Sequence, residues 1–243
     1  METVPPATAA MNSFPSGGLA VVLGARGGIG AALVEALAAT QAFGQVLGFG
    51  RQSLPALDLK DESSVAAVAA HVRQQGIPRL IIDATGILHG PGMQPEKALQ
   101  AIDPLAMADA FAINAIGPAL RMKHLLPLLP AEGKSVFATL SAKVGSIGDN
   151  RLGGWYSYRA SKAALNQLVR TAAIELQRRR PQALCIALHP GTVDTALSAP
   201  FARGGLEIQS PAVAARSLLD TLDRASAHDT GSFLSQRGER LPW

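Results

Sequence analysis

The chain has 243 residues, which is enough for one α/β domain with a sizeable core. Hydrophobic residues make up 48% of it and aromatic residues only 5%, so aliphatic side chains must build that core. The net charge of +4 is small, and the basic residues are scattered apart from a short run at 178–180 that suits the end of a helix. Composition therefore argues against a nucleic-acid-binding protein.

The sequence carries no signal for export or for a membrane span. Its single cysteine, Cys185, lies in an apolar run and cannot form a disulfide within the chain, which fits a reducing compartment. The N-terminus lacks the basic start and apolar core of a signal peptide, and the longest apolar region contains Arg26 and Glu35. We expect a cytoplasmic protein in which residues 1–18 are a flexible extension and 19–243 form one domain.

Apolar runs of strand length alternate with segments of helical composition along the whole domain. In chain order the sequence predicts a strand at 19–23, a helix at 28–40, strands at 45–49 and 55–57, a helix at 62–75, a strand at 79–82, a helix at 104–129, a strand at 135–140, a helix at 155–180, a strand at 184–189, a helix at 211–225 and a strand at 232–234. This alternation indicates βαβ units, hence a doubly wound parallel sheet of about seven strands with helices on both faces.

A glycine-rich turn joins the first strand to the first helix. Glycines stand at Gly24, Gly28 and Gly30, with Ile29 between the last two. Glycine turns before helices are common, so the pattern alone is weak. Between a strand and a helix, however, it allows a tight turn and close approach of the backbone to a pyrophosphate. The setting predicts a Rossmann-type dinucleotide site.

The end of the second strand indicates which dinucleotide is bound. An NAD site places an acidic residue about 20 residues beyond the glycines, where it binds the ribose 2′-hydroxyl. Here that place holds Arg51, and Arg26 within the glycine turn adds a second cation. Two cations and no carboxylate predict a preference for NADP(H) over NAD(H). The alternative is that Arg51 is an ordinary surface residue.

Two further segments are candidates for the cofactor. Asp58 and Leu59 follow the predicted strand at 55–57 and could hold an adenine ring, although a turn-forming Asp before a helix is equally plausible. Ala84, Thr85 and Gly86 close the strand at 79–82, where small residues let the backbone lie against the cofactor.

Tyr158 and Lys162 are four residues apart, which places them on one face of the helix predicted at 155–180. A phenol normally titrates near pH 10, and a nearby ammonium lowers its pKa. Such a tyrosine could exchange a proton near neutral pH. Spacing alone does not separate this pair from a packed tyrosine and a solvated lysine.

Taken in order, these motifs resemble the short-chain dehydrogenase/reductase family from residue 19 to about 198. The ordered set consists of the turn from Gly24 to Gly30, Asp58, the strand end from Asp83 to Gly86, Asn114, Ser141, the pair Tyr158 and Lys162, and the run from Pro190 to Thr195. The segment at 153–166 looks like the branch of C-factor-like and sniffer-like carbonyl reductases.

The resemblance implies a role for each matching residue. Tyr158 would be the general acid for reduction and the general base for oxidation; its rival Tyr156 is followed four residues later by Ala160, not by lysine. Lys162 would lower the pKa of Tyr158 and hold the nicotinamide ribose, and Asn114 would anchor a water in a proton relay to Lys162.

Other matching residues would bind the substrate or the nicotinamide. Ser141 would hydrogen-bond the substrate carbonyl. Pro190, Gly191, Val193 and Thr195 would line the nicotinamide end of the cofactor. A proline-glycine turn is the plain alternative for that run.

The chain also departs from the family pattern. Leu23 replaces the usual threonine before the first glycine, and Asp83-Ala84-Thr85-Gly86 replaces Asn-Asn-Ala-Gly. The family often has two serines where this chain has Ser141 and Ala142, and the second of them is catalytic. We assign the role to Ser141, with Ser146 as the alternative.

The resulting prediction is an NADP-dependent oxidoreductase acting on a carbonyl or secondary alcohol, without a metal. A substrate loop around 196–210 contains Gly204 and Gly205 as a hinge, and Phe201, Leu206 and Ile208 favour an apolar ketone. The alternative is a C-factor-like nucleotide-binding signal or sensor protein. The family pairs its long helices between subunits, so the resemblance implies a homodimer or homotetramer.

Overall fold

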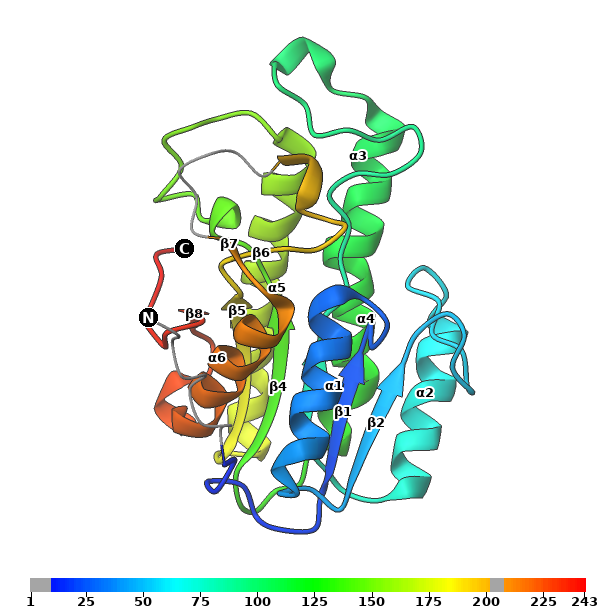
Figure 1. Cartoon of the computed structure of the whole chain (residues 1–243), viewed down its shortest axis with the longest axis vertical. Helices are drawn as coiled ribbons and strands as arrows, with labels where there is room; N and C mark the ends of the chain where they lie inside the picture. The colour runs from blue at the N-terminus through cyan, green and yellow to red at the C-terminus, as the bar shows by residue number, and fades with distance from the viewer. Residues whose placement is uncertain (1–9, 202–207) are drawn as a thin grey trace, which may run out of the picture.

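A parallel sheet of six strands forms the centre of the molecule, in the order β2-β1-β3-β4-β5-β8 (Figure 1). The computed structural model describes residues 10–201 and 208–243. The strands are β1 (Leu19–Leu23), β2 (Gln45–Phe49), β3 (Pro78–Asp83), β4 (Ser135–Leu140), β5 (Ala183–His189) and β8 (Phe233–Ser235). All neighbouring strands run parallel. The α/β fold predicted from the alternation is confirmed.

Helices cover both faces of the sheet. On one face α1 (Gly28–Thr40) and α6 (Pro211–Arg224) pack through aliphatic side chains such as Leu33 and Leu218. On the other face α2 (Glu62–Gln75), α4 (Gly117–Leu125) and α5 (Tyr156–Arg179) contribute residues such as Val68, Leu125 and Leu165. β1 and β4 are buried throughout because they lie between these two layers. Cys185 belongs to this core, and burial raises the pKa of its thiol to about 12.

One predicted strand is wrong. Residues 55–57 form no strand; instead the Ser53 hydroxyl bonds the carbonyls of Gly50 and Pro55, and Leu57 N–H donates to Gly50. Pro55 has no N–H to give to a sheet, so the segment closes on itself as a turn. The sheet accordingly has six strands rather than about seven.

The helix predicted at 104–129 is continuous but changes its winding. It consists of α3 (Pro104–Phe111), a π-helical turn (Ala112–Ile116), α4 and a final 3₁₀ turn (Leu126–Leu128). π-turns inside helices are rare and often occur at functional sites. This one contains Asn114.

The order of the strands places a crevice at their carboxyl ends. From β1 the chain runs outward to β2 and then returns to β3 on the other side of β1, so the direction of winding reverses there. After β5 a short ribbon, β6 (Thr192–Val193) with β7 (Ile208–Gln209), lies near the same end (Figure 1). The predicted hinge glycines Gly204 and Gly205, and Leu206, lie outside the described residues. Among the described helices none is long and apolar enough to cross a membrane.

Candidate cofactor and catalytic site

A cleft of about 600 Å³ opens at this reversal point. It is lined by eight of the residues predicted to bind the cofactor: Gly24, Arg26, Arg51, Asp58, Leu59, Ala84, Thr85 and Gly86. Six other residues that were not predicted as cofactor ligands also line it, namely Gly27, Gly50, Leu57, Lys60, Ile87 and Ile113. Four separate segments predicted from the sequence thus meet around one cleft of a size typical for small-molecule sites.

The glycine turn leaves no space for side chains. Gly24 has φ of +80°, and a Cβ on Gly30 would lie 2.1 Å from the Gly24 carbonyl oxygen. A Cβ on Gly28 would lie 2.7 Å from Cγ2 of Thr195, so the turn also contacts the segment after β5. α1 begins here without a side-chain cap and without an acidic residue in its first turn. Its first N–H groups therefore remain available to an anion.

The cationic end of the cleft contains Arg26 and Arg51, both largely exposed. Asp58, the acidic residue of this cleft, accepts a hydrogen bond from the N–H of Lys60 at 2.9 Å. It thus makes the turn that the sequence analysis kept as the alternative. Lys60 itself pairs with Asp109 at 2.7 Å.

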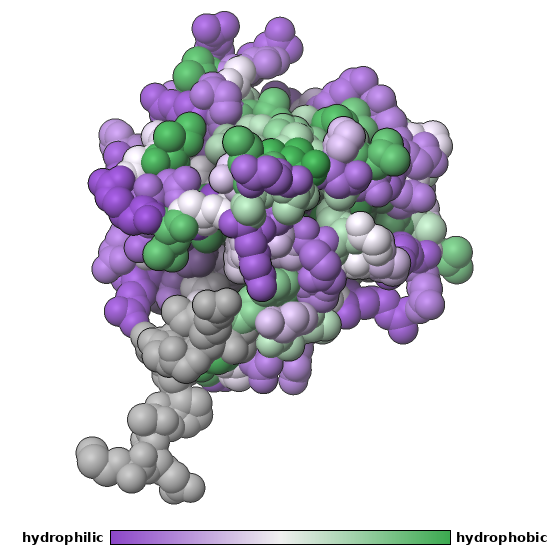
Figure 2. Space-filling model, turned by 90° about the horizontal axis from the view of Figure 1, so that it is seen from above, coloured by the Kyte–Doolittle hydropathy of each residue, from purple (hydrophilic) through white to green (hydrophobic). Residues whose placement is uncertain are grey.

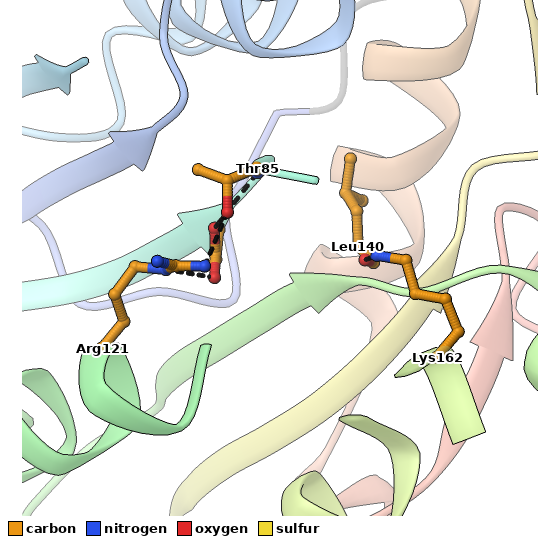
Figure 3. Close-up of polar contacts among 5 residues, drawn as sticks. Thr85, Arg121, Leu140 and Lys162 are labelled. Atoms are coloured by element: carbon orange, nitrogen blue, oxygen red, sulfur yellow. Dashed lines mark hydrogen bonds and ion pairs between the residues drawn. The ribbon is translucent and has the colours of Figure 1, made fainter. Parts of the chain in front are cut away.

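A buried ion pair holds the end of β3. Arg121 Nε lies 2.7 Å from Asp83 Oδ2, and both side chains are fully buried. The hydroxyl of Thr85 donates to Asp83 Oδ1 at 2.6 Å and accepts from Arg121 Nη2 at 2.7 Å (Figure 3). The pair fixes the strand end that forms the floor of the cleft. Arg121 has no local sequence signal, because its partner lies 38 positions earlier in the chain.

Three of the predicted residues converge at one point beyond this floor. A Cβ on Gly86 would lie 3.3 Å from Asn114 Oδ1 and 3.4 Å from Lys162 Nζ. The Asn114 side chain accepts from Ile87 N–H at 2.9 Å and donates to Ile87 O at 2.8 Å and Ser161 Oγ at 3.2 Å. The amide of Asn114 therefore holds the chain after Gly86 against α5.

Lys162 is buried and its ammonium donates to the Leu140 carbonyl at the end of β4, at 2.9 Å (Figure 3). Burial lowers the pKa of Lys162 to about 8, with Asp83 raising it and Arg121 lowering it further. The Nζ atom lies 5.9 Å from the centre of the Tyr158 ring.

The pKa of Tyr158 moves opposite to the expectation. Burial raises the pKa of its phenol, whereas the spacing of Tyr158 and Lys162 predicted a lowered pKa. In this structure the charge of Lys162 is directed to Leu140, so the desolvation of the phenol dominates. A raised pKa keeps the proton on Tyr158 at neutral pH.

The hydroxyl of Ser141, predicted to donate to a substrate carbonyl, has a hydrogen-bond partner within the fold. Its hydroxyl donates to Asn166 Oδ1 on α5 at 2.6 Å, and the contact is buried. Side chains alternate along β4, so Phe137 and then Ser141 point toward α5. The Ser141 hydroxyl is thus hydrogen-bonded within the fold, and its role as a donor to a substrate carbonyl stays a prediction. Ser146 is also buried and accepts from Asp149 N–H at 3.1 Å.

The segment after β5 closes on itself near the glycine turn. The Pro190 carbonyl accepts from Gln209 Nε2 at 2.5 Å, and Gly191 has φ of +78°. Val193 pairs with Gln209 in the short ribbon. Thr195 contacts Ser198 through its N–H and its hydroxyl, at 3.2 and 3.1 Å. Of the predicted nicotinamide residues, Thr195 contacts the glycine turn directly.

A group of aromatic rings, missed by the sequence reasoning except for Phe201, lies beside Tyr158. The Trp155 ring is 6.2 Å from Tyr158 and 5.1 Å from Phe201, and the His89 ring is 5.5 Å from Phe201. Figure 2 looks onto this end of the molecule and shows hydrophobic side chains gathered among polar ones. Within the part of the chain that the structure describes, no group of His, Cys, Asp and Glu side chains is placed to hold a metal ion.

Comparison with known proteins gives consistent matches. The family model described as enoyl-(acyl carrier protein) reductase matches residues 9–223. The 1-hydroxy-2-glutathionyl-2-methyl-3-butene dehydrogenase of Rhodococcus sp. strain AD45 is 32% identical over 189 residues, which cover 78% of this chain and 79% of that protein. The C-signal protein of Myxococcus xanthus is 35% identical over 148 residues, which cover 60% of this chain and 84% of that protein.

Solved structures share the fold at lower identity. The NADPH-bound carbonyl reductase from chicken fatty liver has a TM-score of 0.82 at 24% identity, with 100% of both chains covered. The carbonyl reductase Sniffer of Drosophila melanogaster has a TM-score of 0.79 at 21% identity, covering 94% of this chain and 100% of that one.

The ion pair under the cleft leads to a stability prediction. Changing Arg121→Met leaves Asp83 buried without a counter-charge, and we expect the free energy of unfolding to fall by about 3–5 kcal/mol. Asp83→Asn should cost a similar amount for the same reason. The double variant should lose clearly less stability than the two single variants lose together. Urea unfolding of the unchanged protein, both single variants and the double variant measures these losses. Additive losses would show that the pair is not coupled.

Proposed function

Because the chain belongs to the short-chain dehydrogenase/reductase family, whose members are NAD(P)-dependent oxidoreductases, we propose that it transfers hydride between NADP(H) and a carbonyl or secondary alcohol. The family match confirms the resemblance found in the sequence. The observation that carries the proposal is the convergence of Gly86, Asn114 and Lys162 near Tyr158, at the inner end of a cleft lined by the glycine turn.

The residues present fit a bound dinucleotide phosphate. The uncapped start of α1 and the crowded glycine turn suit a pyrophosphate, and Arg26 and Arg51 suit a 2′-phosphate. The carbonyl reductase from chicken fatty liver, which has the same fold, has NADPH bound. When bound, the nicotinamide supplies the hydride, and the protein supplies position and electrostatics.

Within this proposal Tyr158 transfers the proton. Its raised pKa keeps the phenol protonated at neutral pH, which is the form that can donate to a carbonyl oxygen during reduction. The ammonium of Lys162 stabilises the phenolate that remains, and below about pH 8 it carries its charge. Asn114 fixes the chain around Lys162 through Ile87 and Ser161.

The aromatic rings support an apolar ketone or alcohol as substrate. Trp155 and Phe201 stand beside Tyr158 and provide ring faces and edges for an apolar group. Two relatives are named as dehydrogenases of hydroxy compounds with an apolar part, the Rhodococcus enzyme above and cis-4-hydroxycyclohexanecarboxylate dehydrogenase of Sinomonas cyclohexanicum. That protein is 30% identical over 197 residues.

A second candidate function is signalling, supported by the 35% identity to C-signal of Myxococcus xanthus. A protein of that kind would bind the nucleotide and show no turnover on a panel of carbonyl substrates. The intact set of Asn114, Tyr158 and Lys162 favours turnover instead.

We also propose a homodimer or homotetramer. Apolar side chains are exposed on the helices that the family pairs between subunits, with Ile116 at 55% and Ile174 at 46% exposure. The cytoplasmic location expected from the sequence stays a prediction.

The two tyrosines provide a matched test of catalysis. Tyr158→Phe removes only the hydroxyl, and we expect kcat to fall by about 10²–10⁴-fold because no group then transfers the proton. Tyr156→Phe, two residues away, should remain within about twofold of the unchanged protein. Both rates are measured by loss of NADPH absorbance with an apolar ketone, and a Tyr158→Phe variant with full activity would refute the assignment.

The cofactor preference can be tested at Arg51. We expect Arg51→Ala to raise the KM for NADPH by about 10–100-fold, because a charge-assisted hydrogen bond to the 2′-phosphate is lost, and to leave the KM for NADH unchanged. Arg73→Ala on the exposed side of α2 is the control. Equal or better use of NADH by the unchanged protein would contradict the NADP preference.

Ser141→Ala separates a structural from a catalytic serine. Since its hydroxyl bonds Asn166, we expect the variant to lose about 1–3 kcal/mol of stability and kcat/KM to fall by less than about tenfold. Ser146→Ala is the paired variant for the alternative serine. A loss of about 10²–10³ in kcat for either variant would identify it as the carbonyl donor.

A further inference from the structure

Tyr158 lies in the first turn of α5, two positions after the first helical residue, Tyr156. The first N–H groups of a helix have no partner within the helix, and helix ends fray when nothing satisfies them. The residue preceding α5 is Trp155, whose side chain cannot accept a hydrogen bond from the first turn. The orientation of Tyr158 therefore depends on what caps α5 from outside.

A carboxylate from a distant part of the chain caps the first turn of α5. Glu96 lies 61 positions before Ser157, the second residue of α5. It stands between β3 and α3, and its side chain is buried. Its Oε2 accepts from the N–H of Ser157 at 3.1 Å, and its Oε1 accepts from the Ser157 hydroxyl. These are the contacts that a capping side chain directly before a helix would make. A negative charge at a helix N-terminus is also favourable for the helix dipole.

The backbone of Glu96 fixes the entry to the helix as well. Its carbonyl accepts from Trp155 N–H at 2.5 Å. Trp155 has a left-handed conformation with φ of +54°, and it follows Gly153 and Gly154 at φ of +63° and +64°. A non-glycine residue in this conformation needs external support, and the bond to Glu96 provides it.

We propose that Glu96 is a positioning residue for Tyr158, acting through Ser157 and Trp155 as the cap of the catalytic helix. The inference rests on the proposed function for its kinetic part. Lys162 lies one turn further along and is held separately by the Leu140 carbonyl. Loss of the cap should therefore disturb Tyr158 while cofactor binding continues.

The kinetic test compares Glu96→Gln with Glu175→Gln, an exposed glutamate further along the same helix. Glutamine has one acceptor oxygen where glutamate has two, and it carries no negative charge, so the cap on Ser157 is weaker. We expect kcat to fall by about tenfold or more, because small displacements of a catalytic group cost rate steeply, while the Kd for NADPH stays within about twofold. Glu175→Gln should match the unchanged protein in kcat and in the Kd for NADPH. An unaltered kcat, or an equal loss of kcat and cofactor affinity, would overturn the proposal.

Ser157→Ala adds a second variant that keeps the fold. It removes the hydroxyl donor, so the remaining N–H matches the single acceptor of glutamine at position 96. The double variant Glu96→Gln with Ser157→Ala should then be no slower than Glu96→Gln alone. A further additive loss would mean that Glu96 does not act through Ser157.

Amide hydrogen exchange of the peptide containing Ser157 and Tyr158 tests the cap without any substrate. We expect faster exchange in Glu96→Gln than in Glu175→Gln, confined to the first turn of α5. If the unchanged protein turns over no carbonyl, the proposed function fails while this comparison still decides the positioning role. Equal exchange in the two variants would refute it.

Discussion

The site depends on an ammonium group that the fold places away from water. Lys162 is buried and its Nζ donates to the Leu140 carbonyl, which ties α5 to the carboxyl end of β4. Burying a charge is costly, and here the cost lowers the pKa of Lys162 to about 8. The position is fixed by backbone that approaches closely: a Cβ on Gly145 would lie 2.7 Å from Cβ of Lys162, and one on Gly86 would lie 3.4 Å from its Nζ. Glycines at these two places let two loops close around the lysine.

The ends of the central strands set the rest of the geometry. The cleft forms where the chain reverses its winding between β2 and β3, and the glycine turn, the arginines and the end of β3 all reach that point from different strands. Beneath the cleft, the ion pair of Asp83 and Arg121 connects β3 with α4. Asp83 raises the pKa of Lys162, and Arg121 lowers it. The charges beneath the cleft are therefore coupled electrostatically to the buried ammonium of Lys162.

The sequence was sufficient where the determining interactions are local. The strand–turn–helix unit around Gly24 and the spacing of Tyr158 and Lys162 follow from neighbouring residues, and the family match confirms the family resemblance drawn from them. The sequence was insufficient where partners are distant. Arg121 with Asp83, Ser141 with Asn166 and Glu96 with Ser157 are separated by 38, 25 and 61 positions, and no periodicity connects them. The strand predicted at 55–57 was wrong because alternation took no account of the missing N–H of Pro55.

The opposite pKa shifts of Tyr158 and Lys162 have one cause, and they bear on how the pair works. Burial favours the neutral form of both groups, so it raises the pKa of the phenol and lowers that of the ammonium. In the proposed reaction, a phenol that keeps its proton is ready to donate it, and the phenolate left behind is stabilised by a positive charge nearby. In this structure the Nζ atom of Lys162 donates to the Leu140 carbonyl, and it lies 5.9 Å from the centre of the Tyr158 ring. The first turn of α5, which carries Tyr158, therefore has to be held as firmly as Lys162 itself, because the separation of the two groups sets how strongly the charge acts on the phenolate.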